Sequence, residues 1–237
     1  ANAPRKRVSL ELGNNSPVII EPDTDIATTA ARIKGAAFGF TGQVCISTQR
    51  IYVHEDIATE FTKALVAETD SLVIGDPADE ATEISALINS DATERIVTWI
   101  SEAVAAGVVI ECGGEVGDNG ILSPTVLSGI TADMKVSCAE VFGPVVGIAT
   151  YTDFEDALAR ANDTIYGLHA AVFTKDIAKA LRAADVLDFA GVLVNEVPTW
   201  RADHMPYGGI RESGNTREGP VYAVQEMTEE RLIVIQA

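Results

Sequence analysis

The stretch that decides the fold is residues 17–54, PVIIEPDTDIATTAARIKGAAFGFTGQVCISTQRIYVH. It begins with a short β-branched run at 17–21 and continues with apolar residues at helical spacing over 25–40, where Asp25 is a suitable N-cap. A second strand pattern follows at 50–54. A strand, a helix and a further strand in this order predict a parallel pair joined by a crossover helix.

The same alternation continues along the chain. Further strands are expected at 108–110, 145–151, 170–173 and 192–195, and further helices at 56–72, 91–106, 154–162 and 177–187. The pattern predicts an α/β fold of three layers (αβα), in which helices cover both faces of a mostly parallel sheet. No internal repeat, low-complexity segment or linker divides the chain.

The composition excludes several kinds of partner. With 17 basic and 35 acidic residues, the net charge of −18 repels nucleic-acid backbones and anionic membrane surfaces. There is no run of about 18 apolar residues. The polar, basic segment 2–7 is unlike a signal peptide, so the expected location is cytoplasmic. The three cysteines show no CxxC spacing, which indicates a reducing compartment without disulfides (Cys45, Cys112 and Cys138).

Cys45 is the leading candidate for catalysis, because two carboxylates in distinctive settings accompany it. Glu11 stands in LELG at 10–13 and Glu140 in EVFGP at 140–144. A thiolate can attack an aldehyde carbon and later leave from a thioester, while a carboxylate takes up protons. No side chain accepts a hydride, so oxidation requires a nicotinamide cofactor. The alternative for a lone intracellular cysteine is a small, buried core residue.

These runs, with GQVC at 42–45, NDTIYGL at 162–168, MPYGG at 205–209 and SG at 213–214, resemble the NAD(P)-dependent aldehyde dehydrogenase superfamily in order and spacing. The resemblance covers almost the whole chain. It implies that Cys45 is the nucleophile and Glu11 the general base. We expect the surroundings of Cys45 to favour its thiolate, so that iodoacetamide labels it before Cys112 and Cys138.

The resemblance also implies a cofactor, NAD or NADP. Glu140 is expected to bind the nicotinamide ribose, Phe142 to pack near the nicotinamide ring, and Gly13 to belong to the same site. Family members carry a nucleotide-binding domain before the base motif, and that domain is expected to be absent from this chain. The positions that select NAD or NADP lie in it. Asn14 and Asn15 stand where the family usually has a second glycine and often a lysine, and asparagine's tolerance of positive φ is expected to preserve the turn.

The segment 197–204 is similar to one that lines the aldehyde tunnel in the family. Trp200, Arg201 and Tyr207 are therefore candidates for the substrate pocket, and a rim aromatic with a cation suits a small polar or anionic aldehyde. The alternative is an ordinary packed Trp and a structural ion pair of Arg201. The three histidines share no metal-ligand spacing, so no metal site is expected (His54, His169 and His204).

The preferred interpretation is a catalytic domain at 1–220 whose parent enzyme oxidises an aldehyde to a carboxylic acid. Two alternatives remain: cofactor-independent ester or thioester hydrolysis by the same thiolate, and a catalytically silent assembly domain. The family resemblance makes 221–237 an oligomerisation segment that supplies an edge strand. Its apolar run at 232–235 predicts a homodimer or larger assembly, since an unpaired apolar strand recruits a partner. The alternative is a tail that folds back onto its own sheet.

Overall fold

The computed structural model describes residues 6–237, so residues 2–5 of the polar N-terminal segment lie outside the described part. Seven strands form one sheet in the order β3-β4-β5-β2-β1-β6-β7. All neighbouring pairs are parallel except β3 and β4, which confirms the predicted fold class. The strands are β1 Ser16–Ile20, β2 Thr48–His54, β3 Val109–Cys112, β4 Thr125–Ser128, β5 Val145–Tyr151, β6 His169–Phe173 and β7 Gly191–Val194.

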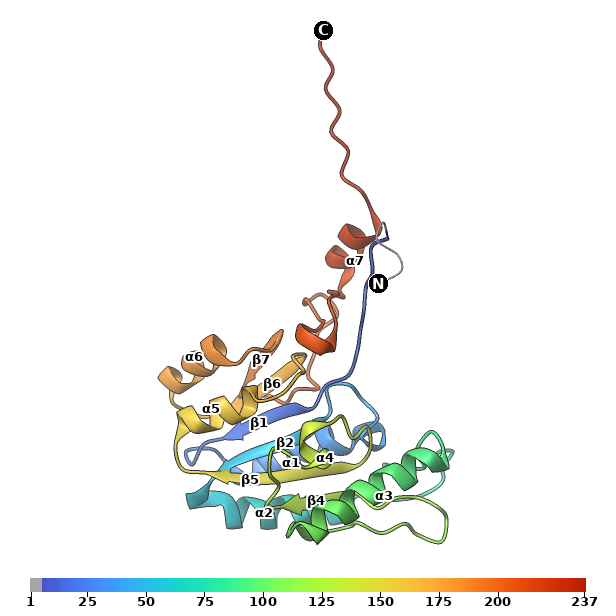
Figure 1. The fold of residues 1–237 in the computed structure, drawn as a ribbon, viewed down its shortest axis with the longest axis vertical. Coiled ribbons are helices and arrows are strands. Elements are labelled where there is room, and N and C mark those ends of the chain that lie inside the picture. The colour runs from blue at the N-terminus through green and yellow to red at the C-terminus, as the bar shows by residue number, and fades with distance from the viewer. Residues whose placement is uncertain (1–5) are drawn as a thin grey trace.

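Helices cover both faces of this sheet (Figure 1). The helices are α1 Ile26–Phe38, α2 Glu55–Asp70, α3 Ser90–Ala105, α4 Lys135–Cys138, α5 Phe154–Asn162, α6 Ile177–Val186 and α7 Pro220–Met227. Most of the predicted ranges agree with these bounds to within two residues. Asp25 caps α1 as expected, because its carboxylate accepts from the Thr28 N–H at 2.8 Å. The short elements β4 and α4 have no counterpart in the sequence prediction, and the helix α7 occupies the start of the segment that was expected to supply an edge strand.

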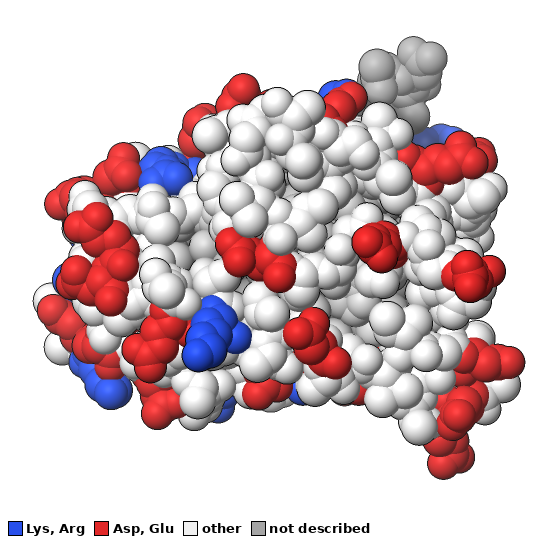
Figure 2. Space-filling model, turned by 90° about the horizontal axis from the view of Figure 1, so that it is seen from below, with Lys and Arg blue, Asp and Glu red and all other residues white. Residues whose placement is uncertain are grey.

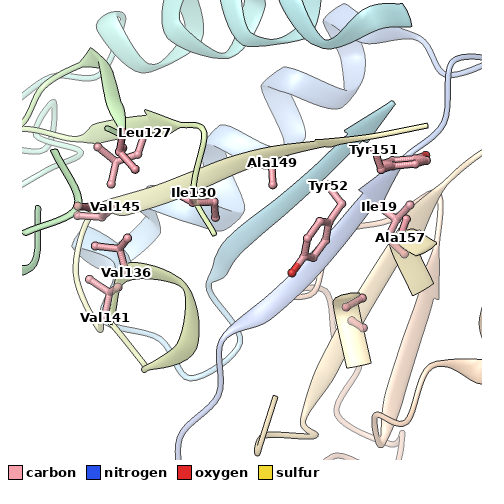
Figure 3. Packing of buried hydrophobic residues seen from close by; sticks show 14 of the residues in the cluster. Ile19, Tyr52, Leu127, Ile130, Val136, Val141, Val145, Ala149, Tyr151 and Ala157 are labelled. Carbon is pink, nitrogen blue, oxygen red and sulfur yellow. The ribbon is translucent and has the colours of Figure 1, made fainter. Parts of the chain in front are cut away.

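Two apolar cores lie on opposite faces of the sheet, because successive strand side chains alternate. Val18 and Ile20 of β1 pack with α1 and α2, whereas Ile19 packs into the core that includes residues of α3, α5 and α6. Figure 3 shows this second core, in which Val136 and Val141 pack beside Val145 of β5. The segment that carries Glu140 is therefore anchored in the core on both sides.

The C-terminal segment departs from the body of the molecule (Figure 1). None of the residues of α7 is buried, and the chain after Met227 is exposed and extended without strand pairing. Arg7 holds the start of this tail through a 3.0 Å hydrogen bond to the Thr228 carbonyl and an ion pair with Glu229 at 2.6 Å. The tail does not fold back onto its own sheet, so that alternative is wrong.

The charge imbalance is visible on the surface. Figure 2 shows carboxylates distributed over much of one face, with few lysines or arginines between them. The acidic residues therefore form no single patch there. Within residues 6–237, no helix is long and apolar enough to cross a membrane.

Candidate active site

The loop that carries Cys45 begins with an unusual left-handed turn. The φ values of Phe40, Thr41 and Gly42 are 53°, 57° and 69°. Residues other than glycine rarely adopt this backbone conformation. A Cβ on Gly42 would lie 2.1 Å from the Gly143 carbonyl oxygen, so only glycine fits this close approach. The turn thus brings the nucleophile loop against the segment that follows Glu140. Cys45 lies on the connection between α1 and β2, as predicted.

The Cys45 thiol is partly buried, and its Sγ lies 2.9 Å from the Tyr207 Oη. Burial raises the pKa of Cys45, and the charges of Glu11 and Glu140 raise it further, while the hydrogen bond from Tyr207 lowers it. The net effect on the pKa of Cys45 is a rise, whereas the sequence led us to expect surroundings that favour the thiolate. A base must take the thiol proton.

Tyr207 is held in place by its neighbours. Its ring meets the buried His169 edge to face, with 5.2 Å between centroids, and the Arg201 guanidinium carbon lies 4.1 Å from the centre of the Tyr207 ring. His169 in turn bonds the Pro198 carbonyl through Nδ1 at 2.7 Å, and Arg201 pairs with Glu218 at 2.9 Å. Burial raises the pKa of Tyr207, so the hydroxyl stays protonated and can donate to sulfur.

Glu11 lies outside the strands of the sheet. It lies before β1, in an isolated antiparallel bridge with Gly214. The Leu12 N–H donates to the Ser213 carbonyl at 3.2 Å, and the Asn215 N–H donates to the Leu10 carbonyl at 3.1 Å. Burial and the neighbouring Glu218 raise the pKa of Glu11, which makes its carboxylate a stronger base. The raised pKa suits the predicted role.

Glu140 and Gly13 are in contact. The Glu140 Oε1 accepts from the Asn14 N–H at 2.9 Å, and a Cβ on Gly13 would lie 2.6 Å from Oε2. Burial raises the pKa of Glu140, against the opposing effects of the Asn14 N–H and the Arg95 charge. Phe142 is 40% exposed and has a φ of 50°. The residues assigned to the cofactor thus lie together, with the Phe142 ring accessible.

Asn14 and Asn15 hold the turn through their side chains. Neither has a positive φ, so tolerance of that region is not what preserves it. The Asn14 Nδ2 donates to Ser16 Oγ at 2.7 Å. The Asn15 Nδ2 donates to the Ser137 carbonyl at 2.8 Å, and its Oδ1 accepts from Thr164 Oγ1 at 3.1 Å. Asn15 therefore connects three segments that are far apart in the sequence.

Ser213 joins two further motifs to the base motif. Its hydroxyl donates to the Gly13 carbonyl at 2.6 Å and accepts from the Gly167 N–H at 2.9 Å. Ser213 is buried, so both partners depend on it for these bonds. The runs at 10–13, 162–168 and 213–214 are therefore one structural unit around the site.

A cleft of about 340 Å³ opens onto the thiol. Cys45, Arg201 and Tyr207 line it, together with Thr199 of the predicted segment 197–204. Sequence reasoning did not identify the other lining residues, which are Gly35, Ala36, Gly39, Phe40, Val44 and Ile46. Trp200 does not line this cleft. It borders a separate groove of about 570 Å³ beside β7, which corrects its assignment to the substrate pocket.

The site lies at the amino ends of the parallel strands. Gly13 precedes β1, Cys45 precedes β2 and Glu140 precedes β5, while His169 opens β6. Open α/β sheets usually bind ligands at the carboxyl ends of their strands, so this sheet uses the opposite edge. Among residues 6–237, no group of three or more metal-ligating side chains is placed to hold an ion.

Known proteins are similar to this chain in sequence and in fold. The model of the aldehyde dehydrogenase family matches residues 1–233. The 3-sulfolactaldehyde dehydrogenase of Priestia aryabhattai is 47% identical over 230 residues, which cover 97% of this chain and 48% of the relative. Aldehyde dehydrogenase 21 from Physcomitrella patens, in complex with the reaction product succinate, superposes with a TM-score of 0.92 at 38% identity, over 96% of this chain and 47% of that one.

A second solved structure gives the same result. The glyceraldehyde-3-phosphate dehydrogenase GapN from Methanocaldococcus jannaschii, complexed with NADP, superposes with a TM-score of 0.91 at 37% identity, over 95% of this chain and 49% of that one. The chain thus spans about half the length of the relatives it matches. On the match of its motifs, its fold and nearly its whole length, the chain belongs to the aldehyde dehydrogenase family.

Proposed function

We propose that this chain is the thiol-bearing catalytic domain of an NAD(P)-dependent enzyme that oxidises a small aldehyde to a carboxylic acid. The observation that carries the proposal is the Cys45 thiol, which borders an open cleft and is influenced by two carboxylates from separate segments, Glu11 and Glu140. A core cysteine requires neither the cleft nor the nearby acids.

The chain's own residues supply the proton transfers and the nucleophile. Glu11 takes the Cys45 proton, and the thiolate adds to the aldehyde carbon to form a thiohemiacetal. The Cys45 N–H is a donor for the developing oxyanion, and a second donor is assigned to the nucleotide-binding domain. While the thiohemiacetal is oxidised to the thioester, Glu11 releases that proton to solvent. Glu11 then takes a proton from water, the water oxygen bonds to the acyl carbon, and the carbon–sulfur bond breaks, which returns Cys45 as a thiolate.

Glu140, Phe142 and Gly13 are the residues proposed to hold the cofactor. Glu140 has a second carboxylate oxygen, Oε2, beyond the one that accepts from Asn14, and Gly13 lets the carboxylate lie where a Cβ would clash with it. This suits a ribose hydroxyl pair, and the exposed Phe142 ring suits an aromatic base. When bound there, NAD or NADP supplies the hydride acceptor that oxidation of the thiohemiacetal requires.

A small anionic aldehyde is the proposed substrate class. Arg201 lines the Cys45 cleft, and a guanidinium there can pair with a carboxylate, sulfonate or phosphate. The names of three relatives agree with an anionic substrate, because they refer to sulfolactaldehyde, glyceraldehyde 3-phosphate and succinate. Other relatives are named for lactaldehyde or betaine aldehyde, which carry no net negative charge. The ion pair between Arg201 and Glu218 must open for that contact. It can open, because both side chains are partly exposed.

Turnover in an enzyme that joins this chain to a nucleotide-binding domain tests the proposal. Cys45→Ser should abolish NAD(P)H formation from a small anionic aldehyde, whereas Cys138→Ser should leave it unchanged. The chain by itself should bind NAD only weakly, because among its described residues no glycine-rich turn at a helix N-terminus can hold the pyrophosphate. Calorimetry that gave micromolar affinity, or turnover by the Cys45→Ser enzyme, would contradict it.

We infer in addition that the chain self-associates through its tail. β7 is an edge strand, and the groove beside it is lined by Gly191 through Glu196. The tail is extended and carries an apolar run whose residues are 70–87% exposed (Leu232, Ile233, Val234 and Ile235). An unpaired apolar strand and an open sheet edge are complementary in two copies of one chain. Their pairing is the proposed contact.

Light scattering on the full chain and on a version that ends at Met227 separates this contact from others. The full chain should be a dimer or larger, and the shortened chain should be a folded monomer. A full chain that stays monomeric at high concentration would overturn the inference.

A further inference from the structure

Gln49 lies on β2, shortly after the nucleophile loop, and its side chain is 5% exposed. All three hydrogen bonds of its amide reach one other segment. Nε2 donates to the Ala139 carbonyl at 2.6 Å and to the Val136 carbonyl at 3.3 Å. Oε1 accepts from the Val141 N–H at 3.0 Å. The amide therefore contacts the residues immediately before and after Glu140.

The chemistry of these partners fixes the orientation of the amide. A carbonyl needs a donor and an N–H needs an acceptor, so a flipped amide would place like groups against each other at Ala139 and Val141. Only an amide of this length satisfies both sides at once. A residue with a hydroxyl or a carboxylate in place of Gln49 could not donate two hydrogen bonds and accept one in this geometry.

The Glu140 segment has little other support from the backbone. The Ala139 N–H donates to the carbonyl of Lys135, the first residue of α4, and the next backbone bond joins the Val145 N–H to the Gly143 carbonyl. Among the described residues, the backbone groups of 140–142 form no hydrogen bond with another backbone group. The Val141 carbonyl accepts from Arg95 Nη2 at 2.8 Å. Side-chain hydrogen bonds from Gln49 and Arg95 therefore take the place of backbone hydrogen bonds in this segment. Of these two residues, only Gln49 bonds both to Ala139 and to Val141, the residues on either side of Glu140.

We propose that Gln49 is a positioning residue that holds the Glu140 carboxylate against the Asn14 N–H and beside Gly13. Its amide fixes the peptide units on both sides of Glu140, so the carboxylate emerges at one place. The catalytic consequence rests on the proposed function, in which Glu140 binds the cofactor. The position of the Glu140 carboxylate does not depend on the proposed function, and it can be measured without turnover.

The Asn14 N–H reports on this geometry, because its bond to Glu140 Oε1 depends on where the carboxylate lies. Gln49→Met keeps the length and packing of the side chain but removes every hydrogen bond of the amide. Amide hydrogen exchange at Asn14 should then become about tenfold faster under native conditions. Gln49→Asn, which retracts the amide by one carbon, gives the same comparison if the methionine variant does not fold.

Tyr151→Phe is the matched control. Tyr151 is buried, and its hydroxyl bonds the Ile20 carbonyl at 3.0 Å and Glu21 at 2.5 Å, at the far end of the strands. Its loss should lower the melting temperature and leave Asn14 exchange unchanged. If Gln49→Met and Tyr151→Phe affect Asn14 equally, Gln49 stabilises only the fold and the proposal is overturned.

An enzyme that joins this chain to a nucleotide-binding domain gives the functional comparison. Gln49→Met should raise the KM for the cofactor by up to about 100-fold, because the Glu140 carboxylate is misplaced, while kcat changes less. A KM equal to that of the parent enzyme would contradict the catalytic consequence. If the parent enzyme itself shows no aldehyde oxidation, the proposed function fails and the exchange measurement still decides the geometry.

Discussion

The Cys45 Sγ and the Tyr207 Oη are 2.9 Å apart, and burial keeps the phenol protonated. The hydroxyl is therefore the donor of this bond when the sulfur is a thiolate. This bond lowers the pKa of Cys45, as does a smaller effect of the Cys45 backbone N–H, against the larger effect of burial. The reactivity of the nucleophile thus depends on a residue far away in the sequence.

Tyr207→Phe should slow alkylation of Cys45 by iodoacetamide about five- to tenfold at pH 8, because the thiolate loses its donor. The phenylalanine ring keeps the contacts with His169 and Arg201. Peptide mass mapping over time gives the rate. A rate equal to that of the parent chain would show that the hydroxyl does not support the thiolate.

Removal of the Glu140 charge should have the opposite effect. The negative charge raises the pKa of Cys45, so Glu140→Gln should lower that pKa and shift the alkylation profile toward lower pH. The glutamine oxygen can still accept from the Asn14 N–H. Glu155→Gln, on the exposed surface of α5, is the control and should leave the profile in place. A profile shifted toward higher pH would contradict the sign.

The three cysteines should be labelled in the order Cys138, Cys45, Cys112 at pH 8. Cys138 is exposed, whereas burial raises the pKa of Cys112 to about 11. This order replaces the expectation from the sequence that Cys45 reacts first. Labelling of Cys45 ahead of Cys138 would show that its thiolate is stabilised by more than Tyr207.

Salt should stabilise the folded chain. With a net charge of −18, repulsion between carboxylates opposes the compact state, and raising KCl from 0.01 to 1 M shortens the screening distance from about 30 Å to about 3 Å. The melting temperature should rise by several degrees over this range. A melting temperature that falls would mean that the ion pairs matter more than the repulsion.

The sequence predicted the sheet well, because its central strands are buried on both faces and appear as continuous apolar runs. The bounds of β5 and α5 agree with the prediction to the residue. β4 was missed because, of its four residues between Pro124 and Gly129, only Val126 and Leu127 are apolar. The single turn of α4 is too short for a helical period to show.

The candidate residues of the site came from motifs, and their geometry came from the structure. Motifs identified Cys45, Glu11 and Glu140, and the fold brings their segments to one edge of the sheet. The role of Gln49 could not be predicted from the sequence. It depends on the carbonyl and N–H groups that its amide bonds, and these lie far away in the chain. Trp200 was misplaced because adjacent residues of a loop can face different grooves.

The mass of the Cys45 peptide after an acid quench tests the central claim most directly. An enzyme that joins this chain to a nucleotide-binding domain is mixed with NAD(P)+ and a small anionic aldehyde, and quenched within the first turnovers. The account predicts an acyl group on Cys45 and none on Cys112 or Cys138. Continued aldehyde oxidation without an acyl group on Cys45, or with the group on Cys112 or Cys138, would contradict it.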